Sequence, residues 1–547
     1  MRHSLAIREW LPILSIGLVD GVIVLPLIIS FAILIFSGEL GAFATTGIGM
    51  VLFGGLILQI IMGLTSSVPG MLGGPQDSPA AVLGLTAAAI VASMKDAPIE
   101  AKFITVVATT VLTSIIAGFF FVFIGGFKLS RFVRFVPYPV VGGFIAGTGL
   151  LLVQGAIGVL LGFTPDLANL NLLFTAGNLL LWIPGIVFGT LVLISSRRFN
   201  HFLAYPALLV GTIAVFYISM WISGFDTHEL RQMGLLLGPF PHGALWKPLD
   251  FSLLAQVDWK IIVGQSSNIA AVAIISLVSL LLNASALELI AQKDVDLDRE
   301  LISTGIANIA SGLGGSSVGY HMLGISSLAF RMGISNRLVS LLAASVTGIT
   351  LLFGASLLSL IPKLIAGGLI FFVGLSFLME WLYDAWFQLP RIDYMLVWVI
   401  LIVVGAFGFL EGVGTGIVIA VVLFVVNYSR IDIIKDVLTG TSYQSHTERP
   451  FEQRQLITRL GERIQILRLH GFIFFGTSQS LVNHINHRIK DSEREKLHYL
   501  ILDFQHVSAL DSSAVFSFIR LRQLANTHEF HLVLSDLNQE TKNKLSR

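Results

Sequence analysis

The chain has 547 residues, of which 54% are hydrophobic and 12% are charged, and its formal net charge is +1. Soluble domains carry about 25% charged residues, so this composition excludes a soluble globule and predicts that lipid covers much of the surface. The small net charge gives no indication of nucleic-acid binding. The absence of Cys excludes disulfides and Cys-based metal sites.

Apolar stretches of the length that crosses a bilayer, about 20 residues, recur through most of the chain. We expect spans near 11–36, 41–64, 101–125, 137–162, 172–195, 203–222, 259–290, 335–358, 361–380, 391–410 and 412–429. Three more segments, 79–94, 298–312 and 319–331, are short, glycine-rich at one end or partly polar. The first stretch is too long for a signal-peptide core, so we expect it to be retained. Together these stretches predict fourteen membrane segments.

Basic loop residues predict the orientation. Most Lys and Arg residues, such as Lys128 with Arg131 and Arg197 with Arg198, fall on the side of the N-terminus when fourteen segments are threaded. Cytoplasmic loops carry the Lys and Arg excess. We therefore expect an integral protein of the plasma (inner) membrane with both termini in the cytoplasm.

The chain also repeats itself. Residues 136–145 (VPYPVVGGFI) are similar to 361–370 (IPKLIAGGLI), and a Gly-Gly pair precedes a short segment in each half, at 73–74 and at 314–315. Seven segments per half is an odd number, so the halves run in opposite directions, as in the inverted repeats of secondary transporters. We predict a transmembrane transporter domain over 1–432, with repeats at about 11–222 and 259–430.

The composition changes near Ile431. Residues 433–459 are polar and predict a linker, and 460–547 predict a cytoplasmic α/β domain. Alternating or continuous apolar runs predict strands at 465–469, 473–475, 499–503 and 531–534, with helices at 478–490 and from about 513.

Several motifs together resemble the sulfate permease (SulP) family of transporters. They are 137–147 (PYPVVGGFIAG), 300–308 (ELISTGIAN) with the following Gly314-Gly315, and 361–363 (IPK). The tail resembles the STAS domain, which these transporters share with anti-sigma-factor antagonists, through 502–503 (LD) and 511–514 (DSSA).

The resemblance implies an all-α membrane fold of fourteen segments in two inverted seven-segment repeats, divided into core and gate domains, plus a small cytoplasmic α/β STAS domain. It also implies a homodimer, an elevator-like movement of the core, and a solute site between the ends of the third and tenth segments. The family transports inorganic or dicarboxylate anions such as sulfate and bicarbonate, so the resemblance implies a small charged solute of that kind.

The first glycine break, 73–79 (GGPQDSP), places polar groups at the start of a half-helix within the membrane. Free N–H groups at such a terminus, with their partial positive charge, suit a substrate oxygen. Candidate substrate-binding residues here are Gly74, Gln76, Asp77 and Ser78. Asp77 or Ser78 is equally suited to cap its own helix.

The matching break supplies Ser317, Gly319, Tyr320 and His321 as candidate substrate-binding residues. Hydroxyl and imidazole groups offer a bound solute both donors and acceptors. Tyr320 is as readily interpreted as a core aromatic residue, and His321 as a buried neutral histidine.

Asp20 is the single residue for which the sequence predicts a functional role most specifically. It lies about ten residues, hence about 15 Å, into the first span. Ionisable residues at this depth are costly and mark functional sites by default. We predict that Asp20 couples transport to a proton or ion, with Asp77 as a second candidate; a purely structural, hydrogen-bonded carboxyl group is the alternative.

The sequence departs from the family pattern at two places. Many relatives carry an acidic residue in the middle of the eighth segment, where this chain has Ser279, with Asn283 and Glu288 further along. Many also carry an Arg soon after the start of the tenth segment, and 320–330 contains none. The site is therefore poor in positive charge, which favours the alternative of a proton-coupled transporter for a cationic or zwitterionic solute such as a basic amino acid.

In the tail, Ser512 matches the serine that is phosphorylated in anti-sigma-factor antagonists. A regulatory role for Ser512 and a simple role as a helix start both fit this position.

We find no nucleotide loop, metal-ligand cluster or nucleophile motif, so we expect no enzyme activity, no cofactor and no metal. We expect H+ or Na+ as the coupling ion. An alternative of another class is a membrane-anchored ligand sensor that acts through the STAS domain.

Overall fold

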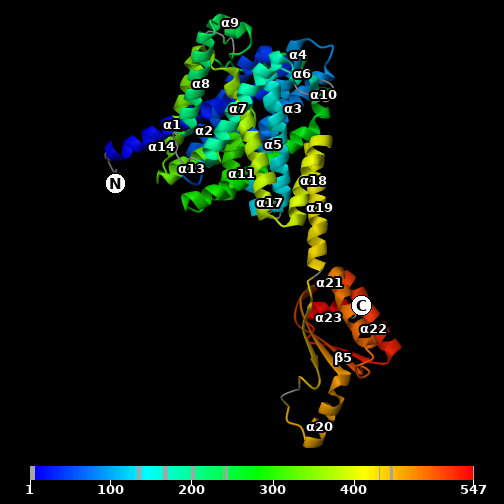
Figure 1. The fold of residues 1–547 in the computed structure, drawn as a ribbon. Helices are drawn as coiled ribbons and strands as arrows, with labels where there is room; N and C mark the ends of the chain where they lie inside the picture. Colours follow the sequence, from blue (N-terminus) through cyan, green and yellow to red (C-terminus); the bar gives the residue numbers. More distant parts are fainter. Residues whose placement is uncertain are drawn as a thin grey trace. The chain divides into compact units, whose positions relative to one another are not determined.

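The helices of the membrane part follow the predicted segments in order (Figure 1). The structure is a computed structural model and describes residues 7–131, 137–163, 170–198, 204–237, 240, 244–429, 431–443 and 447–545. The chain divides into two compact units, Met1–Ile417 and Val418–Arg547.

Fourteen helices in the described ranges match the fourteen predicted segments. They are α1 (Ile7–Ile35), α2 (Ala44–Thr65), α3 (Asp77–Ser93), α4 (Ile99–Gly126), α5 (Tyr138–Leu161), α7 (Ala176–Arg198), α8 (Ala204–Ile222), α11 (Ser266–Ala291), α12 (Leu297–Gly312), α13 (Leu323–Arg331), α14 (Arg337–Phe353), α16 (Lys363–Leu378), α18 (Arg391–Phe407) and α19 (Phe409–Ser429). Within the described residues, eight helical stretches are long and apolar enough to cross a membrane by length and composition.

Short elements join these helices. In the described ranges they are α6 (Leu170–Leu173), α9 (Thr227–Gln232), α10 (Trp259–Gly264), α15 (Ala355–Leu358), α17 (Ala385–Gln388), two 3-10 turns (Gly38–Phe43 and Phe251–Gln256) and a π-helical turn (Met379–Asp384). A further 3-10 turn, Gly461–Arg463, lies in the C-terminal part. The predicted span 259–290 is therefore two helices, α10 and α11, and the predicted span 335–358 is α14 followed by α15.

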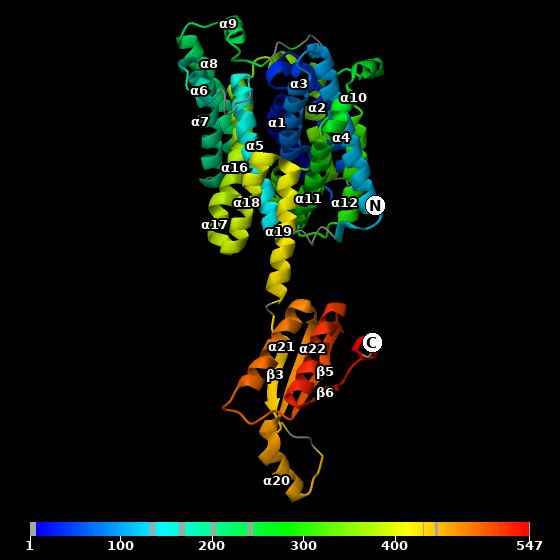
Figure 2. The same ribbon diagram turned by 90° about the vertical axis from the view of Figure 1, so that its right-hand side faces the viewer.

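The helices of the membrane part pack in two groups (Figures 1 and 2). In one group α4 packs along α12, and α14 packs against α1 and α2. In the other group α16 packs against α5 and α7, and α5 against α18. The repeated motif marks the start of two helices in the second group, one from each half of the chain. Pro137 is the N-cap of α5, and Pro362 is the N-cap of α16.

The α4–α12 crossing depends on two glycines. A Cβ atom at Gly305 would lie 2.6 Å from the carbonyl oxygen of Gly118, and one at Gly118 would lie 2.7 Å from that of Gly305. Small residues allow helix backbones to approach closely in membranes. The two positions therefore accept glycine alone at this separation.

Replacing Gly305 by Ala is expected to destabilise the protein by about 1–3 kcal/mol, the usual cost of overpacking, measured as a lower thermal unfolding temperature in detergent. Gly126→Ala on α4 is the matched control, since no described atom lies within 4 Å of a Cβ at that position. Equal unfolding temperatures for the two variants would contradict the close crossing.

The C-terminal part is a four-stranded sheet with two long helices. The strands are β3 (Ile434–Thr439), β4 (Ile464–Ile473), β5 (Tyr499–Leu510) and β6 (His531–Ser535), and the helices are α20 (Phe451–Leu460), α21 (Phe475–Lys490), α22 (Ser512–His528) and α23 (Gln539–Leu545). The sheet order is β3-β4-β5-β6, with β3 antiparallel and the other neighbours parallel.

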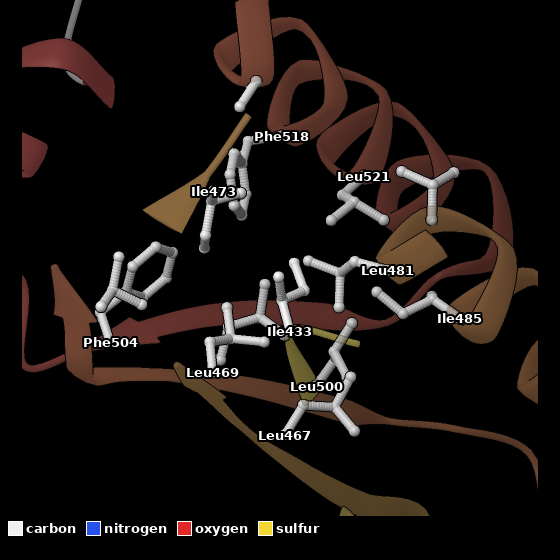
Figure 3. Packing of buried hydrophobic residues seen from close by; sticks show 14 of the residues in the cluster. Ile433, Leu467, Leu469, Ile473, Leu481, Ile485, Leu500, Phe504, Phe518 and Leu521 are labelled. Atoms are coloured by element: carbon white, nitrogen blue, oxygen red, sulfur yellow. The ribbon is translucent and has the colours of Figure 1, made fainter. Parts of the chain in front are cut away.

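The core of this part lies between the sheet and α21 and α22 (Figure 3). Leu467 and Leu500 of the strands and Leu481 and Leu521 of the helices are completely buried. The alternating apolar positions of β4 account for its one buried face, as the sequence pattern predicts.

Two expectations for the tail need correction. The predicted linker 433–459 contains β3, which pairs with β4 from Ile434↔Leu469 to Thr439↔Gln465. The predicted strand at 473–475 does not form, because β4 ends at Ile473 and α21 begins at Phe475. The Phe474 N–H donates to Thr477 Oγ1 at 3.1 Å and so starts a helix instead of extending the strand.

Candidate functional site

The two glycine breaks meet and form a small antiparallel ladder. Strand β1 (Gly73–Pro75) pairs with β2 (Gly319–His321), with Gly74 opposite Tyr320. A Cβ atom at Gly319 would lie 2.5 Å from the carbonyl oxygen of Gly74, so the approach requires glycine. The half-helices α3 and α13 start just beyond the ladder, which confirms the predicted meeting of the two breaks.

Asn308 of α12 holds the backbone of the second glycine break in place through two hydrogen bonds to Gly319. Its Oδ1 accepts the N–H of Gly319 at 2.8 Å, and its Nδ2 donates to the Gly319 carbonyl at 2.7 Å. Both groups of this irregular backbone are thereby satisfied within the membrane, where unpaired backbone groups are costly.

A cavity of about 530 Å³ lies beside the ladder. Residues from both packing groups line it. They are Leu27 and Phe31 of α1; Gln76, Asp77 and Ser78; Tyr138, Val141 and Ile145 of α5; Ser279, Leu282, Asn283 and Ala286 of α11; Tyr320, Met322, Leu323, Gly324 and Ile325; and Val373, Phe377, Glu380 and Trp381. This volume falls within the range of small-molecule pockets.

Of the twelve site residues predicted in the membrane part, six line the cavity and six do not. Those that do are Gln76, Asp77, Ser78, Ser279, Asn283 and Tyr320; those that do not are Asp20, Gly74, Glu288, Ser317, Gly319 and His321. Gly74 and Gly319 instead form the ladder, while Ser317 is buried behind it.

Asp77 is the first residue of α3, and one oxygen of its carboxylate accepts hydrogen bonds from Ser78. Oδ1 accepts the backbone N–H of Ser78 at 2.6 Å and the Ser78 hydroxyl at 3.1 Å. Oδ2 makes no hydrogen bond to the described part of the protein, and Asp77 is partly exposed at the cavity wall. The carboxylate therefore supports its own helix start and still offers one oxygen to a solute.

Tyr320 and Gln76 connect the two breaks. The Gln76 amide donates to the Tyr320 carbonyl at 3.1 Å. The Tyr320 side chain is 2% exposed, and its hydroxyl interacts with Ser78 and Ser279. Ser279, which stands where many relatives carry an acidic residue, thus belongs to the polar wall of the cavity.

Glu380 and Trp381 were missed by the sequence analysis. They lie in the π-helical turn Met379–Asp384 that continues α16, and such turns are frequent at functional sites. The Trp381 ring packs beside Tyr138 of α5, with ring centroids 4.9 Å apart. The signal available in the sequence was Glu380 itself, an acidic residue at the end of an apolar span.

The charge of the lining is negative. Asp77 and Glu380 are its acidic residues, and the described residues of the lining include no Lys, Arg or His. The cavity can therefore attract a cationic group with its carboxylates, while the N-terminus of α13, at Gly324 and Ile325, presents backbone N–H groups to an oxygen.

Asp20 lies outside the cavity, on the same helix face as two of its lining residues. Leu27 and Phe31 follow Asp20 by 7 and 11 residues on α1, which are near-whole turns of a helix, so Leu27 is about 10 Å further along. Asp20 is completely buried, and neither carboxylate oxygen has a hydrogen-bond partner in the described ranges. Asp20 lies within the apolar stretch Pro12–Ile35 of α1.

Two further candidates are not among the residues that line the cavity. Glu288 is half-buried on α11, beyond the lining residues Asn283 and Ala286. Ser512 is the exposed first residue of α22, a position that fits both the structural and the regulatory interpretation.

The fold and the paired half-helix site define a membrane transporter of the inverted-repeat class. Residues 14–400 match the model of the sulfate permease family, and residues 455–547 match the STAS domain. The chain therefore belongs to the sulfate permease family, a family of transporters.

Two curated relatives differ in what their names say they carry. The vacuolar basic amino acid transporter VSB1 of Saccharomyces cerevisiae is 28% identical over 452 residues, which are 80% of this chain and 44% of that protein. The bicarbonate transporter BicA of Picosynechococcus is 24% identical over 479 residues, which are 86% of this chain and 80% of BicA. The chain thus spans less than half of the yeast relative.

The fold is shared with a solved mammalian structure. Murine Slc26a9, described as an anion transporter in the inward-facing state, has a TM-score of 0.71 at 17% identity, covering 100% of this chain and 88% of that chain. This similarity supports the predicted all-α fold with a C-terminal STAS domain.

Proposed function

We propose that this protein is a secondary active transporter for a solute that bears a cationic group, such as a basic amino acid, and that the solute binds in the cavity between the half-helices. The observation that carries the proposal is the pair of carboxylates, Asp77 and Glu380, in a lining whose described residues include no basic side chain. A cation in a poorly hydrated site needs such a partner, because desolvation without one is costly.

A zwitterion fits both features of the site. Its ammonium or guanidinium group would meet the carboxylates, and its α-carboxylate would meet the N-termini of the half-helices. Gly324 and Ile325, at the start of α13, belong to the lining. The yeast relative, named as a basic amino acid transporter, supports the same choice of solute.

The test is uptake into vesicles that contain the purified protein, with L-arginine, L-lysine, sulfate and bicarbonate supplied separately. We expect uptake of the two basic amino acids, and mutual competition between them. Uptake confined to sulfate or bicarbonate would reject the cationic solute and leave the transporter class intact. Absence of flux together with ligand-dependent change in the STAS domain would instead support a membrane-anchored sensor.

An inorganic or dicarboxylate anion is the second candidate. It is supported by the family, by the named substrates of bicarbonate and sulfate transporters among the relatives, and by the two half-helix N-termini at the cavity. The two acidic lining residues oppose it, since like charges in a partly dehydrated site repel strongly.

Asp20 is the proposed proton-coupling residue, with Na+ as the alternative ion. A buried carboxyl group without a hydrogen-bond partner is tolerated when a proton or cation neutralises it. Its place on the α1 face that leads to Leu27 supports coupling to events in the cavity.

The remaining parts of the proposal concern the assembly. We place the protein in the plasma membrane with both termini in the cytoplasm, from the Lys and Arg excess of the loops, and we propose a homodimer by analogy with the family. The functional division into a transporter domain over 1–432 and a STAS domain to 547, with 433–459 entering the latter through β3, belongs to the same proposal.

A further inference from the structure

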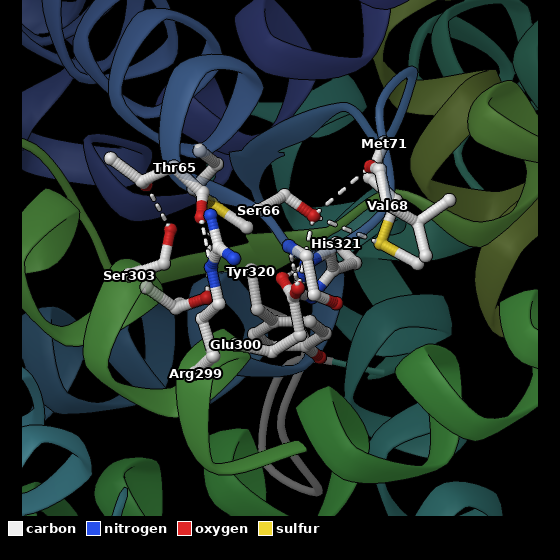
Figure 4. Close-up of polar contacts among 12 residues, drawn as sticks. Thr65, Ser66, Val68, Met71, Arg299, Glu300, Ser303, Tyr320 and His321 are labelled. Carbon is white, nitrogen blue, oxygen red and sulfur yellow. Dashed lines mark hydrogen bonds and ion pairs between the residues drawn. The ribbon is translucent and has the colours of Figure 1, made fainter. Parts of the chain in front are cut away.

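His321 faces away from the cavity and is paired with a buried carboxylate. Successive side chains of an extended strand point to opposite sides, so Tyr320 lines the cavity while His321 points to α12. The His321 Nε2 atom lies 2.7 Å from Oε2 of Glu300, and both side chains are 0% exposed. Figure 4 shows this pair beneath the turn that follows α2.

Glu300 accepts hydrogen bonds on both oxygens. Its Oε1 accepts the backbone N–H of Ser67 at 2.5 Å and the hydroxyl of Ser66 at 3.0 Å, as Figure 4 shows for Ser66. A carboxylate that accepts from several donors is stabilised in its ionised form. His321 Nε2 is accordingly the donor of the third bond.

No Lys or Arg side chain in the described ranges hydrogen-bonds to Glu300. The nearby arginines are committed elsewhere: Arg299 donates to the Thr65 carbonyl, and Arg337 donates to the carbonyls of Leu64 and Ser66. The other charged groups on the packed elements are Asp296 and Asp298 at the start of α12, Glu288 on α11, Asp77 beyond Tyr320, and Glu100 and Lys102 on α4, where the Lys102 amine pairs with Glu39. A second proton on His321 is therefore the group that neutralises this buried carboxylate.

The second ring nitrogen is poised for that proton. Nδ1 of His321 is buried and has no hydrogen-bond partner among the described residues. With Nε2 donating to Glu300, Nδ1 carries a lone pair in the neutral ring and a proton in the charged ring.

The pair also holds residues that line the cavity. The His321 carbonyl accepts from the Asn283 amide at 2.9 Å, and Asn283 lines the cavity on α11. Tyr320 is adjacent in β2 and is fixed by Gln76. A change in how firmly His321 is held therefore affects the positions of three lining residues, Asn283, Tyr320 and Gln76.

We infer that His321 and Glu300 form a proton-binding pair that positions Tyr320 and Asn283, so that solute affinity follows the protonation of His321. This inference rests on the proposal that the cavity is the solute site. In the protonated state the pair is an ion pair that anchors β2 to α12. Loss of the proton leaves a buried carboxylate against a neutral ring, which is a weaker hydrogen bond, and the cavity wall becomes less fixed.

The first test compares L-arginine binding by the full-length protein, its His321→Gln variant and a His228→Gln control, using calorimetry from pH 5.5 to 8. His228 is exposed on α9. In the native protein and the control, we expect the affinity for L-arginine to fall about fivefold as the pH rises. A glutamine amide donates to Glu300 at every pH, so we expect this fall to be absent in His321→Gln. Asp77 contributes a trend of the opposite sign, which all three proteins share. Identical pH profiles for native protein and His321→Gln overturn the inference.

The second test needs no solute. Hydrogen exchange of the peptide that contains Gly319–His321, corrected for intrinsic rates, is expected to be slower at pH 6 than at pH 8 in the native protein and unchanged with pH in His321→Gln. If L-arginine does not bind but this protection follows the expectation, the proposed solute is wrong and the pair stands. If protection is independent of pH in the native protein, the pair is not a proton-binding element.

Discussion

Replacing Asp77 by Asn is expected to weaken L-arginine binding roughly 30-fold, a loss of about 2 kcal/mol, which is the scale of removing a charged hydrogen-bond partner. The physical reason lies in its two oxygens. Oδ1 serves the Ser78 N–H, a bond that the Asn carbonyl keeps, while the free Oδ2 supplies the charge to the solute. The helix start is thus preserved, and the electrostatic contribution is lost. Binding calorimetry on the purified variant measures the effect.

A matched control is Asp96→Asn, which removes the same charge from an exposed position after α3. It is expected to bind L-arginine as the native protein does. An anionic solute predicts the reverse sign for Asp77→Asn, because removal of a carboxylate near the half-helix N-terminus leaves sulfate binding unchanged or tighter. Native affinity for L-arginine in Asp77→Asn would reject Asp77 as the partner of a cation.

Replacing Asp20 by Asn is expected to abolish the stimulation of uptake by a pH gradient and to leave counterflow exchange partly intact. An amide has nearly the same shape as the protonated carboxyl group, so the fold is preserved, but it cannot release or accept the coupled proton. Vesicle uptake with and without an acid exterior measures the first effect. Exchange of labelled for unlabelled L-arginine measures the second.

Asp20→Asn and His321→Gln separate two roles of protons. The former removes the driving effect of a gradient, whereas the latter removes the pH dependence of affinity at equilibrium. Persistent gradient-driven uptake in Asp20→Asn, at the native rate, would show that Asp20 is structural. Asp96→Asn again serves as the charge-matched control.

The sequence predicted the segment order well because long apolar runs and glycine breaks are local features. The pairing of β1 with β2 could also be inferred from the sequence, since both breaks occur at the same place in two inverted repeats. The repeated Pro and Gly-Gly positions then located the starts of α5 and α16.

The sequence predicted the site less completely because its wall is shared by distant helices. Glu380 and Trp381 reach the cavity from the end of α16, and a local pattern does not reveal that approach. His321 was grouped with Tyr320 because the segment was interpreted as a helix start. In the structure 319–321 is a strand, and its alternation sends the two side chains to opposite sides.

The β1–β2 ladder has a consequence for biosynthesis. Its two strands belong to different repeats, so the N-terminal repeat emerges with β1 unpaired and must wait for more than two hundred residues of further synthesis, about 240 by the spacing of Gly74 and Tyr320. Unpaired backbone groups at membrane depth are costly. The first half of the chain therefore cannot form the β1–β2 ladder by itself. Folding of both halves is completed in one late step, in which the two glycine breaks pair.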